Sequence, residues 1–357
     1  MKGKKNFLLL LGSIFLSLLF VEIFFSVFYS QKNITKLYER KKFNLYEQGK
    51  VFKNEGDFFK YHSNKKILTK AFYEINQNYI KEYSYYIETN NFGLVQVNDI
   101  QETIPSILFL GDSFTEGQGR KAWINKFGGK YKDLQTINGG IFGTGPQQFH
   151  LMEKHISKKY NINKVVVLYI GDDFRRSAWN MPSKTFVCLN NQTKCIGDEA
   201  FYGYQFGDGK EKIFLKKISK YRKKSQKMSK SFKKFKRNTM NFILDLNIVY
   251  YPKNTLKKFF YTSNDATIKK NTDSLNSLNK KYGDNIIFIQ LFTKDEILYG
   301  KSYETFHAER YLKTITENHF VCDFEKNINF FYKYDRHPNN LGYDYLFNCV
   351  REILNKF

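Results

Sequence analysis

Cysteine is scarce in this sequence, with 4 residues in 357. None of them has the short spacing of a zinc-binding pair, so no cysteine-ligated metal site is expected. Cys188 and Cys195 bracket a polar loop that could close as a hairpin, and Cys322 and Cys349 lie near the two ends of the C-terminal segment. An even number suits disulfides in an oxidising compartment, and four reduced, buried thiols fit the sequence equally well.

Acidic residues are also few. The 34 Asp and Glu stand against 58 Lys and Arg, which gives a formal net charge of +24. No nucleic-acid-binding motif accompanies this charge, and Lys and Asn are frequent along the whole chain, so we predict no nucleic-acid partner. Attraction to anionic lipid or acidic polysaccharide is the expected consequence. A hydrophobic content of 42%, with 36 Phe and 26 Tyr, indicates a globular protein with a sizeable core.

A small-residue cleavage site is missing from the N-terminal hydrophobic segment. Residues 7–29 carry one charged side chain, and their length is enough to span a bilayer. We therefore predict that residues 1–29 form a cytoplasmic tip and a retained transmembrane helix, with the bulk of the chain outside the cytoplasm. A cleaved signal peptide is the alternative.

Residues 30–105 mix aromatic, Asn and Lys residues without sustained periodicity. Within them, residues 83–97 predict two short strands around a turn at Asn90, Asn91 and Gly93. We interpret the segment as a lead-in that packs on the domain that follows.

The stretch SILFLGDSFTEGQG, residues 106–119, is the centre of the chain's organisation. An apolar run of strand length stops at Gly111, and a helix is expected from Ser113 through Trp123 to about Lys126. Ser113 therefore lies at a strand-to-helix corner, where a hydroxyl projects past the sheet and free helix N–H groups can meet negative charge. These features suit a serine nucleophile. A phosphate-binding turn or an ordinary corner is the alternative.

Two further strands end in polar or glycine-rich turns. Residues 136–148 read TINGGIFGTGPQQ, and the apolar run of residues 165–170 ends at Gly171. Continuous apolar runs are typical of parallel strands that helices cover on both faces, and ligands of such sheets bind at the carboxyl ends of the strands.

The C-terminal part repeats this pattern. Residues 285–291 and 319–324 predict two more strands with a helix between them, and a terminal helix follows the sequence DRHPNN. Within that sequence, Asp335 stands two residues before His337, and Pro338 stiffens the loop. The pair has the character of a general base and the carboxylate that orients it.

Four blocks in this order resemble the SGNH/GDSL hydrolase family, and Thr115 excludes the Gly-x-Ser-x-Gly elbow of other hydrolases. The blocks are Gly-Asp-Ser at Ser113, then Asn138-x-Gly140-x-x-Gly143, Gly171-Asp172-Asp173-Phe174, and Asp335-x-His337. The resemblance implies an α/β fold, a three-layer α/β/α domain with a mostly parallel, flavodoxin-like sheet. It covers residues 106–176 and 272–357, which form two halves of one core, and residues 177–271 are an insertion that contains a basic helical stretch over 210–237.

The resemblance also implies roles for individual residues. Ser113 is the nucleophile, His337 the base, and Asp335 its orienting acid, with Asp323 as a substitute. The oxyanion hole consists of the N–H groups of Ser113 and Gly143, with Gly140 as the alternative to Gly143.

The third block departs from the family pattern. Asp172 occupies the place of the Asn that contributes to the oxyanion hole, and an ionised carboxylate would repel an oxyanion, so Asp172 must be protonated, turned aside or used otherwise. We expect Asp173 to accept backbone N–H bonds within its loop. Arg175 and Arg176 follow directly and are candidates for binding an acidic substrate, or plain surface charges.

The sequence thus predicts a membrane-anchored serine esterase that acts on ester-linked acyl groups without a metal or organic cofactor. An acylated glycan or lipid of the cell envelope is the expected substrate. An O-acyltransferase with the same residues and a non-catalytic envelope binding protein are the alternatives.

Overall fold

The computed structural model describes residues 12–13, 16–24, 41–47, 50–75, 78–120, 122–131, 133–176, 186–187, 190–191, 211, 215–216 and 266–357. Contacts divide the chain into two compact units, and nearly all described residues belong to the unit of Arg40–Leu215 and Thr262–Phe357. In the other unit, residues 12–13 and 16–24 are helical. Within the described ranges, no helix has the length and apolar character to cross a membrane. Much of the predicted transmembrane segment, residues 7–29, lies outside the described ranges.

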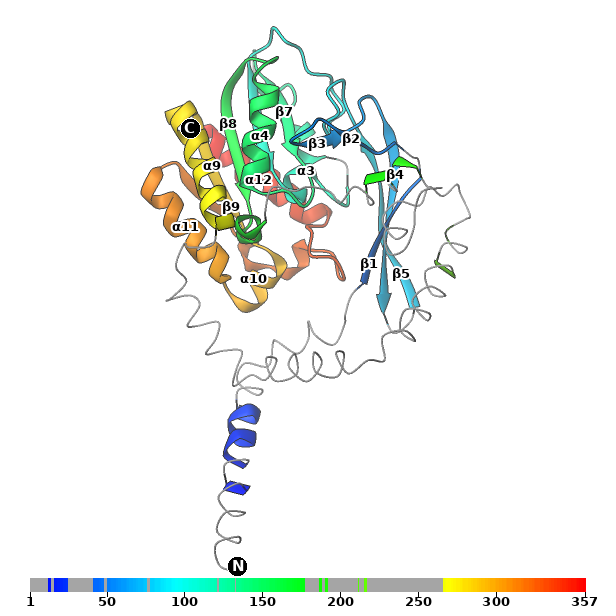
Figure 1. Ribbon diagram of the computed structural model, residues 1–357, viewed down its shortest axis with the longest axis vertical. Helices are drawn as coiled ribbons and strands as arrows, with labels where there is room; N and C mark the ends of the chain where they lie inside the picture. Colours follow the sequence, from blue (N-terminus) through cyan, green and yellow to red (C-terminus); the bar gives the residue numbers. More distant parts are fainter. Residues whose placement is uncertain are drawn as a thin grey trace, which may run out of the picture. The chain divides into compact units, whose positions relative to one another are not determined.

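A five-stranded parallel sheet forms the centre of the larger unit (Figure 1). Its strands, in spatial order, are β7 (Gln135–Gly140), β6 (Ser106–Gly111), β8 (Ile162–Tyr169), β9 (Ile286–Leu291) and β10 (His319–Cys322). In chain order this is 2-1-3-4-5, the flavodoxin-like arrangement, with its switch point between β6 and β8. The predicted parallel α/β sheet is confirmed.

Helices cover both faces of this sheet because its strands are apolar on both sides. All residues of β6 and β9 are buried. One hydrophobic cluster joins the sheet to α4 (Pro146–Ile156), α9 (Ala266–Tyr282) and α11 (Tyr303–Ile315). The other joins it to α12 (Asn340–Lys356) and the 3-10 helix η1 (Trp123–Phe127). The domain therefore has the three predicted layers.

Shorter elements connect these layers. They are α3 (Ser113–Glu116), α10 (Lys294–Tyr299), and the 3-10 helices η2 (Gly171–Arg175), η5 (Gly283–Asn285), η6 (Phe324–Lys326) and η7 (Ile328–Phe330).

The continuous helix predicted from Ser113 to Lys126 is wrong. The α3 helix ends after one turn, because Gly117 takes a left-handed conformation (φ 91°) and closes it by donating its N–H to the carbonyl of Ser113. The chain then turns and forms η1 instead.

The lead-in forms a separate antiparallel sheet, in the order β1 (Lys41–Tyr46), β4 (Lys66–Ile75) and β5 (Asn78–Glu88). A small hairpin of β2 (Phe52–Asn54) and β3 (Phe59–Tyr61) accompanies it. The predicted pair of short strands over residues 83–97 is wrong in part. Residues up to Glu88 belong to the long β5, and beyond the turn only a single bridge pairs Thr89 with Val95. Side chains of this segment share a hydrophobic cluster with α4, so the lead-in packs on the core.

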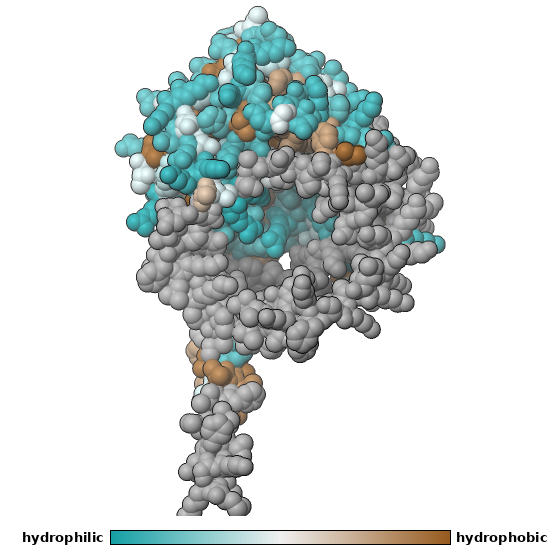
Figure 2. Space-filling view, viewed as in Figure 1, coloured by the Kyte–Doolittle hydropathy of each residue, from teal (hydrophilic) through white to brown (hydrophobic). Residues whose placement is uncertain are grey.

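A disulfide joins Cys322 at the end of β10 to Cys349 in α12. Cys188, Cys195 and almost all of the predicted basic helix over 210–237 lie outside the described residues. On the face shown in Figure 2, the coloured surface of the larger unit is largely hydrophilic with scattered apolar residues, whereas apolar residues gather on the helical residues 16–24.

Candidate active site

Ser113 lies at the corner between β6 and α3, as the sequence predicts. Asp112 caps the helix, and its carboxylate accepts the N–H of Phe114 at 2.9 Å. Only glycine fits at position 111, because a Cβ there would lie 1.9 Å from the Thr115 hydroxyl oxygen. Ser113 is thus the first helical residue, and the first N–H groups of a helix have no partner within it.

His337 lies in a closed loop between η7 and α12. The loop is pinned where Tyr332 donates its N–H to the carbonyl of His337 at 3.1 Å, and a β-bridge pairs Phe331 with Pro338. The buried ammonium of Lys294 donates to the carbonyls of Tyr332 and Lys333 at 2.6 and 2.9 Å. The turn that carries the imidazole is therefore stabilised by its own backbone contacts and by the Lys294 ammonium.

The structure brings Ser113, His337 and Asp335 together. His337 Nε2 lies 2.8 Å from Ser113 Oγ, and His337 Nδ1 lies 2.6 Å from Asp335 Oδ1. The Asp-x-His spacing therefore allows the orienting contact. Asp323, the predicted substitute, instead caps η6 by accepting the N–H of Glu325.

Asp335 has further partners that the sequence did not indicate. Its Oδ2 accepts the ammonium of Lys42 at 2.6 Å and the hydroxyl of Tyr83 at 2.5 Å. Burial acts to raise the pKa of Asp335, but the positive charge of Lys42 and the interaction with His337 outweigh it and hold this pKa well below its ordinary value. The carboxylate is therefore ionised in the folded protein.

Gly143 is the better of the two glycine candidates for an oxyanion donor. The N–H of Gly140 already donates to the side chain of Asn138 at 3.1 Å, and a Cβ on Gly140 would lie 2.4 Å from the backbone nitrogen of Glu116. Gly143 has a positive φ of 72° in the loop after β7. That loop stays beside the Ser113 strand because Ile141 donates its N–H to the carbonyl of Gly111 at 3.1 Å.

Glu116 fixes the same loop from α3. Its fully buried carboxyl accepts the N–H of Phe142 at 2.6 Å and the hydroxyl of Tyr61 at 3.0 Å. Burial raises the pKa of Glu116 to about 8. The burial of Glu116 has no signal in the sequence, because a glutamate on an expected helix is ordinarily a surface residue.

Asp172 faces arginines. One of its carboxylate oxygens pairs with Arg175, and the other lies 3.4 Å from Arg176. Of the three roles considered for Asp172, the geometry favours a carboxylate turned aside into ion pairs. Asp173 accepts the N–H of Ile170 at 3.0 Å, which confirms the predicted loop contact.

Arg176 connects the first and third motif blocks with the loop after β7. Its Nη1 lies 3.0 Å from Asp112, 2.5 Å from Asp173 and 2.8 Å from the carbonyl of Thr144. The guanidinium charge is therefore opposed by buried carboxylates, whereas the side chain of Arg175 is 58% exposed. Substrate binding by either arginine stays a prediction.

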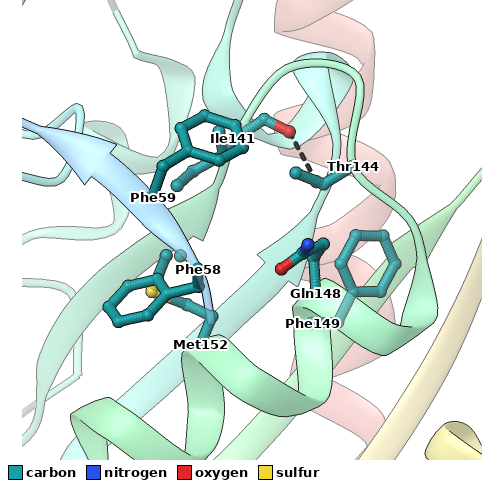
Figure 3. Close-up of a pocket in the computed structure, with 8 residues that line it drawn as sticks. Phe58, Phe59, Ile141, Thr144, Gln148, Phe149 and Met152 are labelled. Carbon is teal, nitrogen blue, oxygen red and sulfur yellow. Dashed lines mark hydrogen bonds between the residues drawn. The ribbon is translucent and has the colours of Figure 1, made fainter. Parts of the chain in front are cut away.

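A small hollow lies beside the Gly143 loop (Figure 3), and none of the residues Ser113, His337 and Asp335 lines it. The hydroxyl of Thr144 donates to the carbonyl of Ile141 at 2.6 Å at its edge. Apolar side chains dominate the lining, which consists of Phe58, Phe59, Gly139, Ile141, Thr144, Gln148, Phe149 and Met152. Because Ser113 and His337 do not line it, this hollow is not the candidate active site.

No protein-family model and no curated protein matches the chain. Solved structures do. A lipolytic protein of the G-D-S-L family from Veillonella parvula is 12% identical, with a TM-score of 0.36, over 71% of this chain and 100% of its own. A lipase/acylhydrolase from Enterococcus faecalis is 13% identical, with a TM-score of 0.35, over 71% and 97%. An acetylxylan esterase from Geobacillus stearothermophilus is 12% identical, with a TM-score of 0.33, over 71% and 95%.

The motif order, the 2-1-3-4-5 sheet and the contact between Ser113 and His337 agree with one another. This chain thus resembles the SGNH/GDSL hydrolases in sequence motifs, in strand order and in the residues that meet at the carboxyl edge of its sheet.

Proposed function

We propose that this protein is a serine ester hydrolase that acts on ester-linked acyl groups. The observation that carries the proposal is the chain of contacts from Ser113 Oγ to His337 Nε2 and from His337 Nδ1 to Asp335. These are the contacts that activate a hydroxyl for acyl transfer and hold the imidazole in the required tautomer.

In the proposed reaction, Ser113 Oγ attacks the ester carbonyl while His337 Nε2 takes the hydroxyl proton. Asp335 stabilises the resulting imidazolium, and the N–H groups of Ser113 and Gly143 donate to the oxyanion. His337 then gives the proton to the departing alcohol, which leaves an acyl group on Ser113. Water attacks this acyl group while His337 accepts one of its protons. The bond between the acyl carbon and Ser113 Oγ then breaks, Oγ takes the proton from His337, and the carboxylic acid leaves.

We further propose that the protein is anchored in a membrane by its N-terminal hydrophobic segment and that the catalytic unit faces outside the cytoplasm. The apolar character of residues 7–29 and the net charge of +24 support this proposal. An acylated glycan of the cell envelope is the substrate class that fits such a location. A glycan hydroxyl in place of water would make the same residues an O-acyltransferase.

Labelling with a fluorophosphonate, which reacts with activated serines, tests the proposal. We expect the wild-type protein to be labelled and Ser113→Ala to remain unlabelled. Asp335→Asn should reduce the labelling rate by about a thousandfold or more, because the imidazole loses its orienting carboxylate. Folded wild-type protein that does not react would favour a non-catalytic binding protein on the same fold.

Hydrolysis of a small aryl acetate then separates the two enzyme activities. The rate of aryl alcohol release is measured with and without an added oligosaccharide. Release of free acetate in both conditions supports a hydrolase, whereas acetate recovered on the oligosaccharide supports a transferase.

A further inference from the structure

The N-terminal sheet contacts the candidate triad although it lies outside all four motif blocks. Lys42 is on β1 and Tyr83 is on β5, and both reach Asp335. These contacts join positions 293 and 252 residues apart in the chain. The proposed hydrolytic reaction has no step that uses Lys42 or Tyr83.

The two carboxylate oxygens of Asp335 have different partners. Oδ1 lies against His337, and Oδ2 accepts Lys42 and Tyr83. The side chain of Asp335 is only 4% exposed, so water contributes little to holding it. The backbone N–H groups of Arg336 and His337 also donate to Oδ1, at 2.7 and 3.2 Å. The sheet therefore supplies the donors to Oδ2, the oxygen that faces away from the imidazole.

Other contacts join the same sheet to the same loop. The carboxylate of Glu82, next to Tyr83 on β5, accepts the N–H of Tyr334 at 3.0 Å. On the serine side, the Gln118 side chain donates to the Tyr83 hydroxyl at 3.2 Å. Tyr83 thus connects the loop that carries His337 to the segment that follows Ser113.

We propose that Lys42 and Tyr83 are positioning residues for Asp335, so that the N-terminal sheet completes the triad and Lys42 shares the negative charge that faces His337. This inference rests on the proposed serine hydrolase function. Tyr83 fixes the carboxylate by a hydrogen bond, and Lys42 fixes it and also weakens the attraction of Asp335 for a protonated imidazole.

The effect of the Lys42 charge on Asp335 has to be distinguished from the effects of the other titratable groups nearby. The titratable groups that face Lys42, Tyr83 and Asp335 from neighbouring elements remain in place in each variant. They are Tyr73, Glu82, Tyr85, Asp112, Glu116, Arg120, Lys294, Tyr332 and Tyr343.

The contact between His337 and Asp335 is followed through the NMR signal of the His337 Nδ1–H proton in the full-length protein, with the signal assigned by its loss in His337→Gln. In Lys42→Met we expect this signal to broaden and its proton to exchange faster with water, because Asp335 loses a donor that fixes its carboxylate against the imidazole. Lys42→Arg should restore the wild-type signal. Identical signals in wild type and Lys42→Met would overturn the inference.

Lys66→Met is the matched control. Lys66 is on the neighbouring strand β4 and pairs with Glu88, with a side chain that is 61% exposed. We expect this variant to keep the wild-type His337 Nδ1–H signal and labelling rate. A change as large as that of Lys42→Met would assign the effect to the sheet's general charge and contradict the proposal.

Tyr83→Phe tests positioning without a change of charge. We expect kcat for aryl acetate hydrolysis to fall about tenfold with KM unchanged, because one hydrogen bond to Asp335 is lost while the ring packing remains. An unchanged kcat would contradict a positioning role for Tyr83. The Nδ1–H signal needs no catalysis, so an unlabelled wild type would refute the hydrolase while the effect of Lys42 on the contact between His337 and Asp335 could still be measured.

Discussion

Glu116 accepts the backbone N–H of Phe142 at 2.6 Å, one residue before Gly143. The contact joins the helix that begins at Ser113 to the loop that carries the candidate oxyanion donor. The nucleophile and the glycine are therefore held at a fixed separation by a buried carboxyl group.

Glu116→Gln should make the protein's stability less dependent on pH. Burial raises the pKa of Glu116 from 4.5 to about 8, so between these values the folded protein keeps a proton that the unfolded chain has released. The free energy of unfolding of the wild type should therefore fall as pH rises through this window, by up to about 1.4 kcal/mol per pH unit. Urea denaturation at several pH values checks the slope.

Glu102→Gln serves as the control, because the Glu102 side chain is 61% exposed. It should follow the wild-type pH dependence. A Glu116→Gln variant with that same slope would show that Glu116 does not retain a proton on folding.

Arg176→Gln should destabilise the protein by about 3–5 kcal/mol, because it leaves the buried carboxyl groups of Asp112 and Asp173 without their cation. Burial and the charge of Asp112 already raise the pKa of Asp173. Arg175→Gln should change stability by no more than about 0.5 kcal/mol, because its side chain is 58% exposed. Chemical denaturation of both variants measures the difference. Equal effects would remove Arg176 from its proposed role in joining the loops.

Asp172→Asn should change the fluorophosphonate labelling rate by less than about tenfold. The Asp172 carboxylate forms ion pairs with Arg175 and Arg176, so the guanidinium groups already oppose its negative charge. An increase of a hundredfold or more, which is the rate effect of one oxyanion-hole donor, would instead indicate that this side chain lies at the oxyanion.

Loss of the disulfide should cost about 3–4 kcal/mol of stability, because Cys322 and Cys349 are separated by 27 positions. The measurement compares urea denaturation of the wild type with that of Cys322→Ser/Cys349→Ser, and peptide mapping of unreduced protein tests the pairing. A double variant as stable as the wild type would show that the bond does not constrain the unfolded chain.

The core of the fold could be predicted because short stretches of sequence identify its strands and turns. The apolar runs of β6, β8 and β9 identify buried parallel strands, and the turns after them carry Ser113, Gly143 and Asp172. The early end of α3 also has a local signal, since glycine at position 117 is a typical helix stop.

The partners of Asp335 had no such signal. A lysine in a basic chain and a tyrosine on a strand look like many others, and only the packing of the N-terminal sheet against the C-terminal loop brings Lys42 and Tyr83 to one carboxylate. Glu116 is similar, because its burial depends on Tyr61, which comes from the small hairpin.

The attachment of the N-terminal sheet to the C-terminal loop bears on how the protein can be shortened for biochemical work. A recombinant fragment cut to begin at Ser106 would keep every family motif and would lose the ammonium and hydroxyl groups that Asp335 meets on its far side. A truncation placed near Arg40, ahead of β1, would retain them.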